Sequence, residues 1–297
     1  MRLKTDDMGA LNTVCTEGAE SRVLPVNEFT LVSFEGVITL LKQAIPVGSI
    51  YNLSKGNDAL DLIIVLEKGC GRKLEIFDDI IDISLLGYEN SYCTLHTFGH
   101  LNQQICEGNL FYGTACAEEN LIYRKSVSNQ LPVVNAQVYQ NRKAYLDVLF
   151  NAEMKRACSF FDGASYYVGN RQLELAVFML QQSVELTYRC FLNLLRGKDM
   201  KCHSLSTLRK NIRRGASKLI GIFSKEEEEE LFYLDFLEKG YCEARYNREY
   251  RVDKEMVLWL RQKVWELHST AFDLYASMMN TMEKGTLEGL VSLEIEL

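Results

Sequence analysis

The chain has 297 residues, 47% of them hydrophobic and 25% charged, with a formal net charge of −7. This composition is that of globular material long enough for about two domains, and it excludes a protein built on a strong basic stripe. The nine cysteines are odd in number and scattered, which is typical of reduced thiols. The mixed first residues do not resemble a signal peptide, and no stretch approaches the ~20 apolar residues of a membrane span. We therefore expect a soluble, cytoplasmic protein with no membrane partner.

The N-terminal half shows short elements of mixed type. Residues 1–25 lack periodicity and are predicted to form a loose arm, and apolar residues at helical spacing predict a helix over 28–44. Two strands are predicted over 49–53 and 60–66. The second strand reads LDLIIVL and is continuously apolar after Asp61, which is typical of a strand buried on both faces of a sheet.

Further elements complete an alternating pattern of strands and helices, which favours an α/β domain over residues 26–126. The segment 127–137, with its proline and small polar residues, is predicted to be a linker. The remaining predicted elements of this half are a helix over 72–86, a strand over 92–97, a helix over 101–106 and a closing strand over 121–124.

The second half has a purely helical pattern, so residues 138–284 are predicted to form a helical bundle, followed by a tail over 285–297. Ser224 and Glu227 form a capping box, and Asp253 is suited to cap the last helix. The predicted helices cover 138–167, 171–195, 204–217, 224–245 and 253–283.

The stretch 173–195 is predicted to be the central helix of this bundle. Its apolar residues fall on two adjacent helical stripes, which leaves a narrow polar side that includes Gln181, Gln182 and Glu185. Such a helix must be buried over most of its surface.

Three motifs in the second half carry a family resemblance. They are AxFxLQQSxE in the central helix, HSLSTL from His203 and EARY from Glu243, and in this order and spacing the segment resembles a HEPN domain. Residues 26–126 resemble the minimal nucleotidyltransferase fold that often precedes HEPN domains in bacterial proteins. The resemblance implies an α/β nucleotidyltransferase-like domain followed by an all-α HEPN-like bundle that pairs as a homodimer.

The nucleotidyltransferase resemblance implies a phosphate-holding Gly-Ser pair and a set of metal-binding carboxylates. Gly48 and Ser49 match the pair, but position 59 is alanine and only Asp61 of the first two carboxylates is present. The next predicted strand, SYCTLHT, has no carboxylate. One acid cannot hold two divalent ions against a triphosphate. We therefore expect a vestigial site at Gly48, Ser49 and Asp61, with no metal or cofactor.

HEPN ribonucleases resemble one another in an arginine followed, after four to six residues, by a histidine. Arg245 matches the arginine, but Tyr250, Arg251 and Val252 stand where the histidine would fall. Tyr250 is a poor base at neutral pH, since the reference pKa of tyrosine is about 10. His203 is a possible catalytic substitute or, alternatively, a loop or N-cap histidine that fixes the start of the next helix.

Two other groups of residues admit two interpretations each. A basic cluster lies either on a solvated face or at a phosphate site, and it contains Arg209, Lys210, Arg213, Arg214 and Lys218. The spacing of Cys93, His96, His100 and Cys106 suggests zinc, but Cys93 falls on a predicted strand, so we interpret these as unrelated residues.

The sequence therefore favours a non-catalytic binding or regulatory HEPN protein. Its expected ligand is a nucleotide, RNA or a protein partner. The expected binding residues are Arg245, Arg248, Arg251, Gln182 and Glu185. We also expect Gln182 or Glu185 to contact Arg245 or its neighbours. The alternative function is a divergent, metal-independent ribonuclease of the toxin–antitoxin kind. Its candidate catalytic residues are Arg245 with Tyr250 or His203.

Overall fold

A computed structural model describes residues 33–54, 60–86, 88, 91–197, 200–223 and 228–284. Several predictions lie outside these residues: the arm over 1–25, position 59, the capping box of Ser224 with Glu227, and the tail over 285–297.

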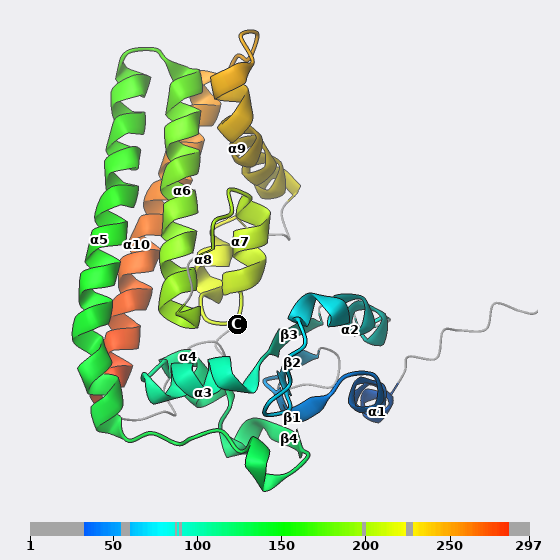
Figure 1. The fold of residues 1–297 in the computed structure, drawn as a ribbon. Coiled ribbons are helices and arrows are strands. Elements are labelled where there is room, and N and C mark those ends of the chain that lie inside the picture. Colours follow the sequence, from blue (N-terminus) through cyan, green and yellow to red (C-terminus); the bar gives the residue numbers. More distant parts are fainter. Residues whose placement is uncertain are drawn as a thin grey trace, which may run out of the picture.

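The N-terminal half is a four-stranded sheet with helices on both faces (Figure 1). The strand order is β3-β2-β1-β4, in which β1 is antiparallel to β2 and β4, and β2 is parallel to β3. The elements are α1 (Phe34–Ala44), β1 (Val47–Asn52), β2 (Asp61–Leu66), α2 (Asp78–Ser84), β3 (Tyr92–His96), α3 (Phe98–Cys106), α4 (Leu110–Ala115) and β4 (Leu121–Arg124), with short 3₁₀ turns at Leu74–Phe77, Glu118–Asn120 and Val127–Asn129.

Strand β2 is buried on both faces, as its apolar run predicted. Leu62 and Ile64 pack on the side covered by α1 and α2, whereas Ile63 and Val65 pack on the side covered by α3 and α4. This alternation follows from the two-residue period of a strand. The run LDLIIVL is apolar without interruption after Asp61 because both faces of the sheet are covered.

The C-terminal half is an elongated bundle around α6, which packs against α5, α7, α9 and α10 (Figure 1). Most residues of α6 are buried, as the two apolar stripes predicted. No helix within the described part of the chain is long and apolar enough to cross a membrane. The helices are α5 (Ala136–Gly169), α6 (Leu173–Arg196), α7 (Leu205–Ile212), α8 (Ser217–Gly221), α9 (Glu228–Tyr246) and α10 (Lys254–Lys284).

The helix predicted over 204–217 is shorter than expected, and a second helix that was not predicted follows it. Helix α7 ends at Ile212 and α8 begins at Ser217. Gly215 lies so close to Leu195 of α6 that an added Cβ would come within 2.4 Å of the leucine side chain. The turn between α7 and α8 therefore packs directly on α6. The side chain of Arg214, in the same turn, contacts residues of the sheet.

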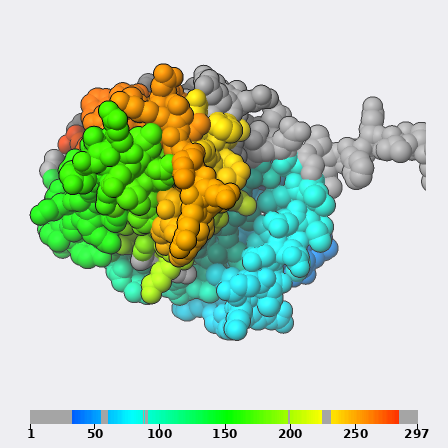
Figure 2. Space-filling view, turned by 90° about the horizontal axis from the view of Figure 1, so that it is seen from above, coloured from blue at the N-terminus to red at the C-terminus, as the bar shows by residue number. Residues whose placement is uncertain are grey.

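The sheet lies beside one end of the bundle, next to α7 and α8 (Figure 1). Seen from above, the N-terminal half, in cyan, lies to one side of the helices of the bundle (Figure 2). Polar contacts join the two halves there: Arg196 donates to the hydroxyl of Tyr92 at 3.0 Å, and Arg142 of α5 donates to the carbonyl of Glu107 at 3.3 Å. The strongest set of contacts comes from Arg214.

Candidate functional site

Arg245 lies in the last turn of α9, on an exposed aromatic surface. Its guanidinium carbon is 3.8 Å from the ring centroid of Tyr241, and its Nε donates to the Tyr241 carbonyl at 2.7 Å. Tyr241 and Arg245 are four residues apart, so they share one face of the helix. The rings of Tyr246 and Phe178 are 4.9 and 5.5 Å from the same guanidinium carbon.

His203 lies against the same tyrosine. Its ring is stacked with that of Tyr241, with 4.7 Å between centroids and 17° between planes. His203 Nδ1 is 3.1 Å from both carboxylate oxygens of Glu185, and the side chain of His203 is 57% exposed. A carboxylate accepts from Nδ1–H, and in the neutral form of the ring this contact leaves the lone pair on Nε2.

Glu185 is the buried anchor of this group, with its side chain only 2% exposed. Its carboxylate accepts from Nε2 of Gln182 at 3.1 Å and of Gln181 at 3.3 Å, and Arg189 is 3.6 Å away. These donors compensate a charge that would otherwise be costly to bury. We refer to Glu185, His203, Tyr241 and Arg245 as the Arg245 cluster.

The structure brings the predicted residues together only in part. The polar contacts of Glu185 go to His203 and to residues of its own helix, so its link to Arg245 passes through His203 and Tyr241. Tyr241 was missed from the sequence. Its position four residues before Arg245 was the available signal.

His203 does not cap a helix. Ser204 is the N-cap of α7, because its side chain accepts from the backbone N–H of Thr207. Of the two forms of that interpretation, the N-cap was wrong, and His203 is a residue of the loop before α7. Its ring lies in the Arg245 cluster.

Tyr250 lies apart from this cluster. Its hydroxyl is buried and has no hydrogen-bond partner among the described residues, and its ring packs on Phe236 with 6.0 Å between centroids. Burial raises the pKa of Tyr250, which disfavours the ionised form further. The geometry therefore argues against Tyr250 as an acid or base. Arg248 and Arg251 are exposed nearby, and Arg251 donates to the carbonyls of Arg248 and Tyr250.

The predicted vestigial nucleotidyltransferase residues are part of the packed sheet. Ser49 is 0% exposed in the middle of β1. A Cβ added to Gly48 would lie 2.8 Å from Oδ1 of Asn129 and 3.1 Å from the backbone of Glu67. This arrangement leaves no room for a triphosphate at the Gly-Ser pair.

Asp61 is paired with Arg214, which reaches across from the turn between α7 and α8. The guanidinium of Arg214 also donates to the carbonyls of Leu62 at 2.7 Å and Tyr92 at 3.0 Å, and to Oγ1 of Thr94 at 2.8 Å. Burial raises the pKa of Asp61, and the positive charge of Arg214 opposes that rise. The arginine thus supplies the counter-charge that a metal ion would supply.

The basic cluster is neither a uniform solvated face nor a single phosphate site. Arg214 is 6% exposed, and Arg209 is 5% exposed and donates to the carbonyls of Ile220 and Phe223. Both interpretations were therefore wrong for these two arginines, which have structural roles. Lys210, Arg213 and Lys218 remain exposed.

A buried Ser–His–Cys group inside the bundle was not found from the sequence. The hydroxyl of Ser183 donates to the carbonyl of Ala157 at 2.9 Å and lies 2.9 Å from Nε2 of His268. Cys158 Sγ is 3.8 Å from Nδ1 of the same histidine. Because the serine proton is held by a carbonyl, the Nε2–H of His268 donates to the serine oxygen. Burial lowers the pKa of His268 to about 4. The group is therefore a neutral core contact and not a nucleophile with its base.

The residues with zinc-like spacing do not form a metal site. Cys93 lies on β3, whereas Cys106 is an exposed residue at the end of α3. His96 and His100 stack on each other with 5.9 Å between centroids. Among the described residues, no group of three or more His, Cys, Asp or Glu side chains could hold a metal ion.

Comparison with known families gives a match for part of the helical half. Residues 150–270 match the HEPN domain, so this chain contains a HEPN domain. The matched segment begins in α5, ends in α10 and includes the whole Arg245 cluster. It covers less than half of the chain, and the α/β sheet lies outside it. The search of curated proteins found no match.

Proposed function

We propose that this protein binds single-stranded RNA or a related nucleotide at the Arg245 cluster and does not cleave it. The observation that supports this function is the exposed guanidinium of Arg245 on the Tyr241 ring, with the His203 ring stacked on the same tyrosine. In this proposal the α/β half is a nucleotidyltransferase-like domain without catalytic activity.

The chemistry of the cluster suits a nucleic acid. An exposed arginine attracts phosphate, and exposed aromatic or guanidinium planes stack on unpaired bases. The chain as a whole carries a charge of −7, so the attraction must be local. The ring of Tyr246, which is 76% exposed, extends this surface beside Arg245.

Binding is favoured over cleavage because the two candidate catalytic groups are held separately. Metal-independent cleavage needs a histidine and an arginine on the same phosphodiester, the first to move the proton and the second to stabilise charge. Here the Nε of Arg245 is bound to the Tyr241 carbonyl, and within the described residues no hydrogen bond joins Arg245 to His203.

The second candidate function is a ribonuclease, and one observation favours it. Glu185 contacts Nδ1 of His203, so in the neutral ring Nε2 carries the lone pair that a general base requires, and the side chain of His203 is 57% exposed. A phosphodiester that reached both Nε2 and Arg245 could then be attacked by its own 2′-hydroxyl.

We also expect the HEPN halves to pair as a homodimer in the cytoplasm, as the family resemblance implies. Light scattering on the purified chain tests the pairing. The expected mass is twice the 34.1 kDa of one chain, and a mass of one chain at all concentrations would contradict it.

A binding titration and a cleavage assay separate the two functions. In EDTA, labelled single-stranded RNA should bind the wild-type chain and remain intact on a denaturing gel. Arg245→Ala and Tyr241→Ala should each weaken binding about tenfold. The matched control is Arg156→Ala, because Arg156 is an exposed arginine of the same bundle that pairs with Glu153. Cleavage that disappears in both Arg245→Ala and His203→Ala would establish the ribonuclease instead.

A further inference from the structure

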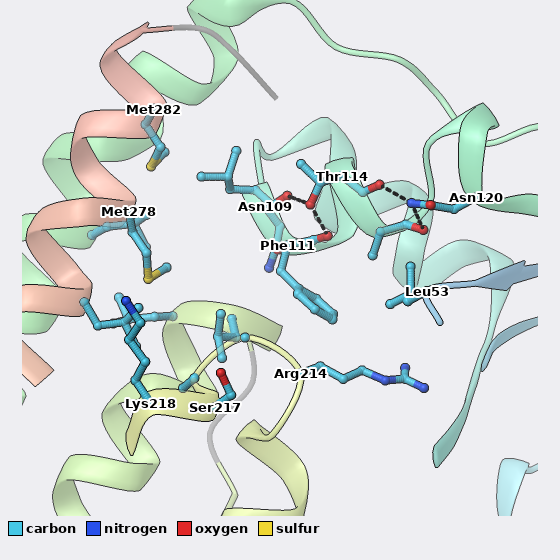
Figure 3. A pocket seen from close by; sticks show the side chains of 18 of the residues that line it. Leu53, Asn109, Phe111, Thr114, Asn120, Arg214, Ser217, Lys218, Met278 and Met282 are labelled. Atoms are coloured by element: carbon cyan, nitrogen blue, oxygen red, sulfur yellow. Dashed lines mark hydrogen bonds between the residues drawn. The ribbon is translucent and has the colours of Figure 1, made fainter. Parts of the chain in front are cut away.

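A cavity of about 380 Å³ lies where the two halves meet, away from the Arg245 cluster (Figure 3). Its walls come from the end of β1, from α4, α5 and α6, from the turn between α7 and α8, and from α10. Pockets for small ligands span about 300–1,000 Å³, so this one suits a small molecule.

One side of the cavity is apolar and adaptable. Met278 and Met282 extend into it from α10, and Phe111 extends into it from α4 (Figure 3). Leu146 and Leu195 complete this surface. Methionine side chains adjust to irregular shapes, which favours a flexible aliphatic chain over a rigid ring.

The polar groups on the α4 side are already occupied. Asn109 accepts from the Tyr112 backbone N–H and donates to Gln104, and the Thr114 hydroxyl donates to the Leu110 carbonyl. Nδ2 of Asn120 donates to the carbonyls of Thr114 and Ala115 (Figure 3). Few directional hydrogen bonds are left for a base or a sugar, whereas an alkyl chain needs none.

The charge around the cavity is of one sign. Among the described residues that line it there is no Asp or Glu, although the chain carries −7 overall, and the three charged residues are Arg142, Arg214 and Lys218. Arg214 is paired with Asp61, and Arg142 is 3.5 Å from the carboxylate of Glu107. Lys218 is exposed and has no ion pair with any described residue. A lining of this kind favours a ligand with one negative end.

We propose that this cavity binds a medium-length aliphatic carboxylate. The chain lies against Leu195, Met278 and Met282, and the carboxylate lies at Lys218. Because the walls come from both halves and include Arg214, the ligand would also strengthen the contact between the sheet and the bundle. This proposal is independent of the RNA-binding function.

Calorimetric titration of the full-length chain with sodium alkanoates of increasing length tests the proposal. Each added methylene should tighten binding roughly fourfold until the cavity is full. Lys218→Met should weaken every member of the series by a similar factor, on the order of tenfold. Met278→Trp should shorten the longest chain that binds. Lys210→Met is the control, since Lys210 is exposed on α7 and does not line the cavity.

Three results would overturn the proposal. One is an alkanoate affinity that responds neither to chain length nor to the substitutions Lys218→Met and Met278→Trp. Another is displacement of the alkanoate by AMP, which would assign the cavity to a nucleotide. The third is binding only to a chain truncated after Lys284, which would assign the cavity to the chain's own C-terminal segment. Arg245→Ala should leave alkanoate binding unchanged.

Discussion

Arg214 and Arg245 use the same side chain in opposite ways. Arg214 is 6% exposed and makes hydrogen bonds or an ion pair with four residues of the sheet, all in the other half of the molecule. Arg245 is exposed, donates to a carbonyl of its own helix and lies on aromatic rings. The comparison indicates that the first arginine stabilises the assembly of the two halves, whereas the second remains available to a ligand.

The two histidines of the helical half, His203 and His268, also differ in that one is exposed and the other is buried with polar partners. His268 is buried, bonded to Ser183 and held neutral, while His203 is stacked on Tyr241 and its side chain is 57% exposed. Buried polar groups must have partners, and those partners remove them from chemistry. An exposed group that is held by a single hydrogen-bond partner among the described residues, as the ring of His203 is by Glu185, can still contact a ligand.

The largest effect is expected for Arg214→Ala. Removing this side chain leaves Asp61 and two backbone carbonyls without their partner, so the free energy of unfolding should fall by about 3–5 kcal/mol. Urea denaturation measures this change. Arg213→Ala, at the exposed neighbouring residue, should have little effect. The double variant Arg214→Met with Asp61→Leu should recover most of the loss, and no recovery would mean that the charge pair is not the cause.

A second effect concerns acid stability. Because burial lowers the pKa of His268 from 6.5 to about 4, the unfolded chain takes up a proton at a higher pH than the folded chain does. The stability contributed by the neutral histidine is therefore present above pH 6.5 and is lost as pH falls to about 4, by about 3 kcal/mol. Chemical denaturation at a series of pH values measures the slope. His268→Gln should reduce the slope of the free energy of unfolding against pH in this range, whereas His203→Gln should leave that slope unchanged.

A third effect separates binding from folding at the exposed arginine. Arg245→Ala should lower RNA affinity about tenfold and leave the urea midpoint unchanged. Anisotropy and denaturation on the same sample provide both values. A large fall in the midpoint would show that Arg245, like Arg214, is a structural residue.

The smallest effect is expected for Arg251→Ala. The guanidinium of Arg251 donates to two carbonyls of its own loop, so it contributes to RNA binding only through its charge. Affinity should change less than about threefold at physiological salt, as measured by anisotropy. A loss as large as that of Arg245→Ala would extend the binding surface along this loop.

Much of the fold could be predicted because it depends on local pattern. The apolar run of β2 and the stripes of α6 specify burial directly. The boundary between α7 and α8 could not be predicted, since it depends on the approach of Gly215 to Leu195. The sequence does show a glycine at this position, but it does not show which residue the glycine approaches.

The roles of the charged residues were harder to predict. Arg209 and Arg214 lie in a dense basic stretch that is typical of a solvated surface, yet both are buried. Arg209 donates to carbonyls 11 and 14 residues away, whereas the partners of Arg214 are remote in sequence. Arg214, for example, donates to a carbonyl 152 residues away. Glu185, His203 and Arg245 all lie in the motifs that carry the family resemblance, and the structure brings Glu185 into contact with His203. The motifs could not show that Tyr241 joins His203 to Arg245, because that contact depends on the packing of α9 on α6.

The central claim is that the Arg245 cluster binds RNA without cutting it, and a single titration tests it most directly. Labelled single-stranded RNA is titrated in EDTA with the wild-type chain, Arg245→Ala and Arg156→Ala, and each sample is then run on a denaturing gel. The account predicts intact RNA throughout and weaker binding in Arg245→Ala alone. Equal binding by all three chains, or cleavage that depends on Arg245 and His203, would contradict it.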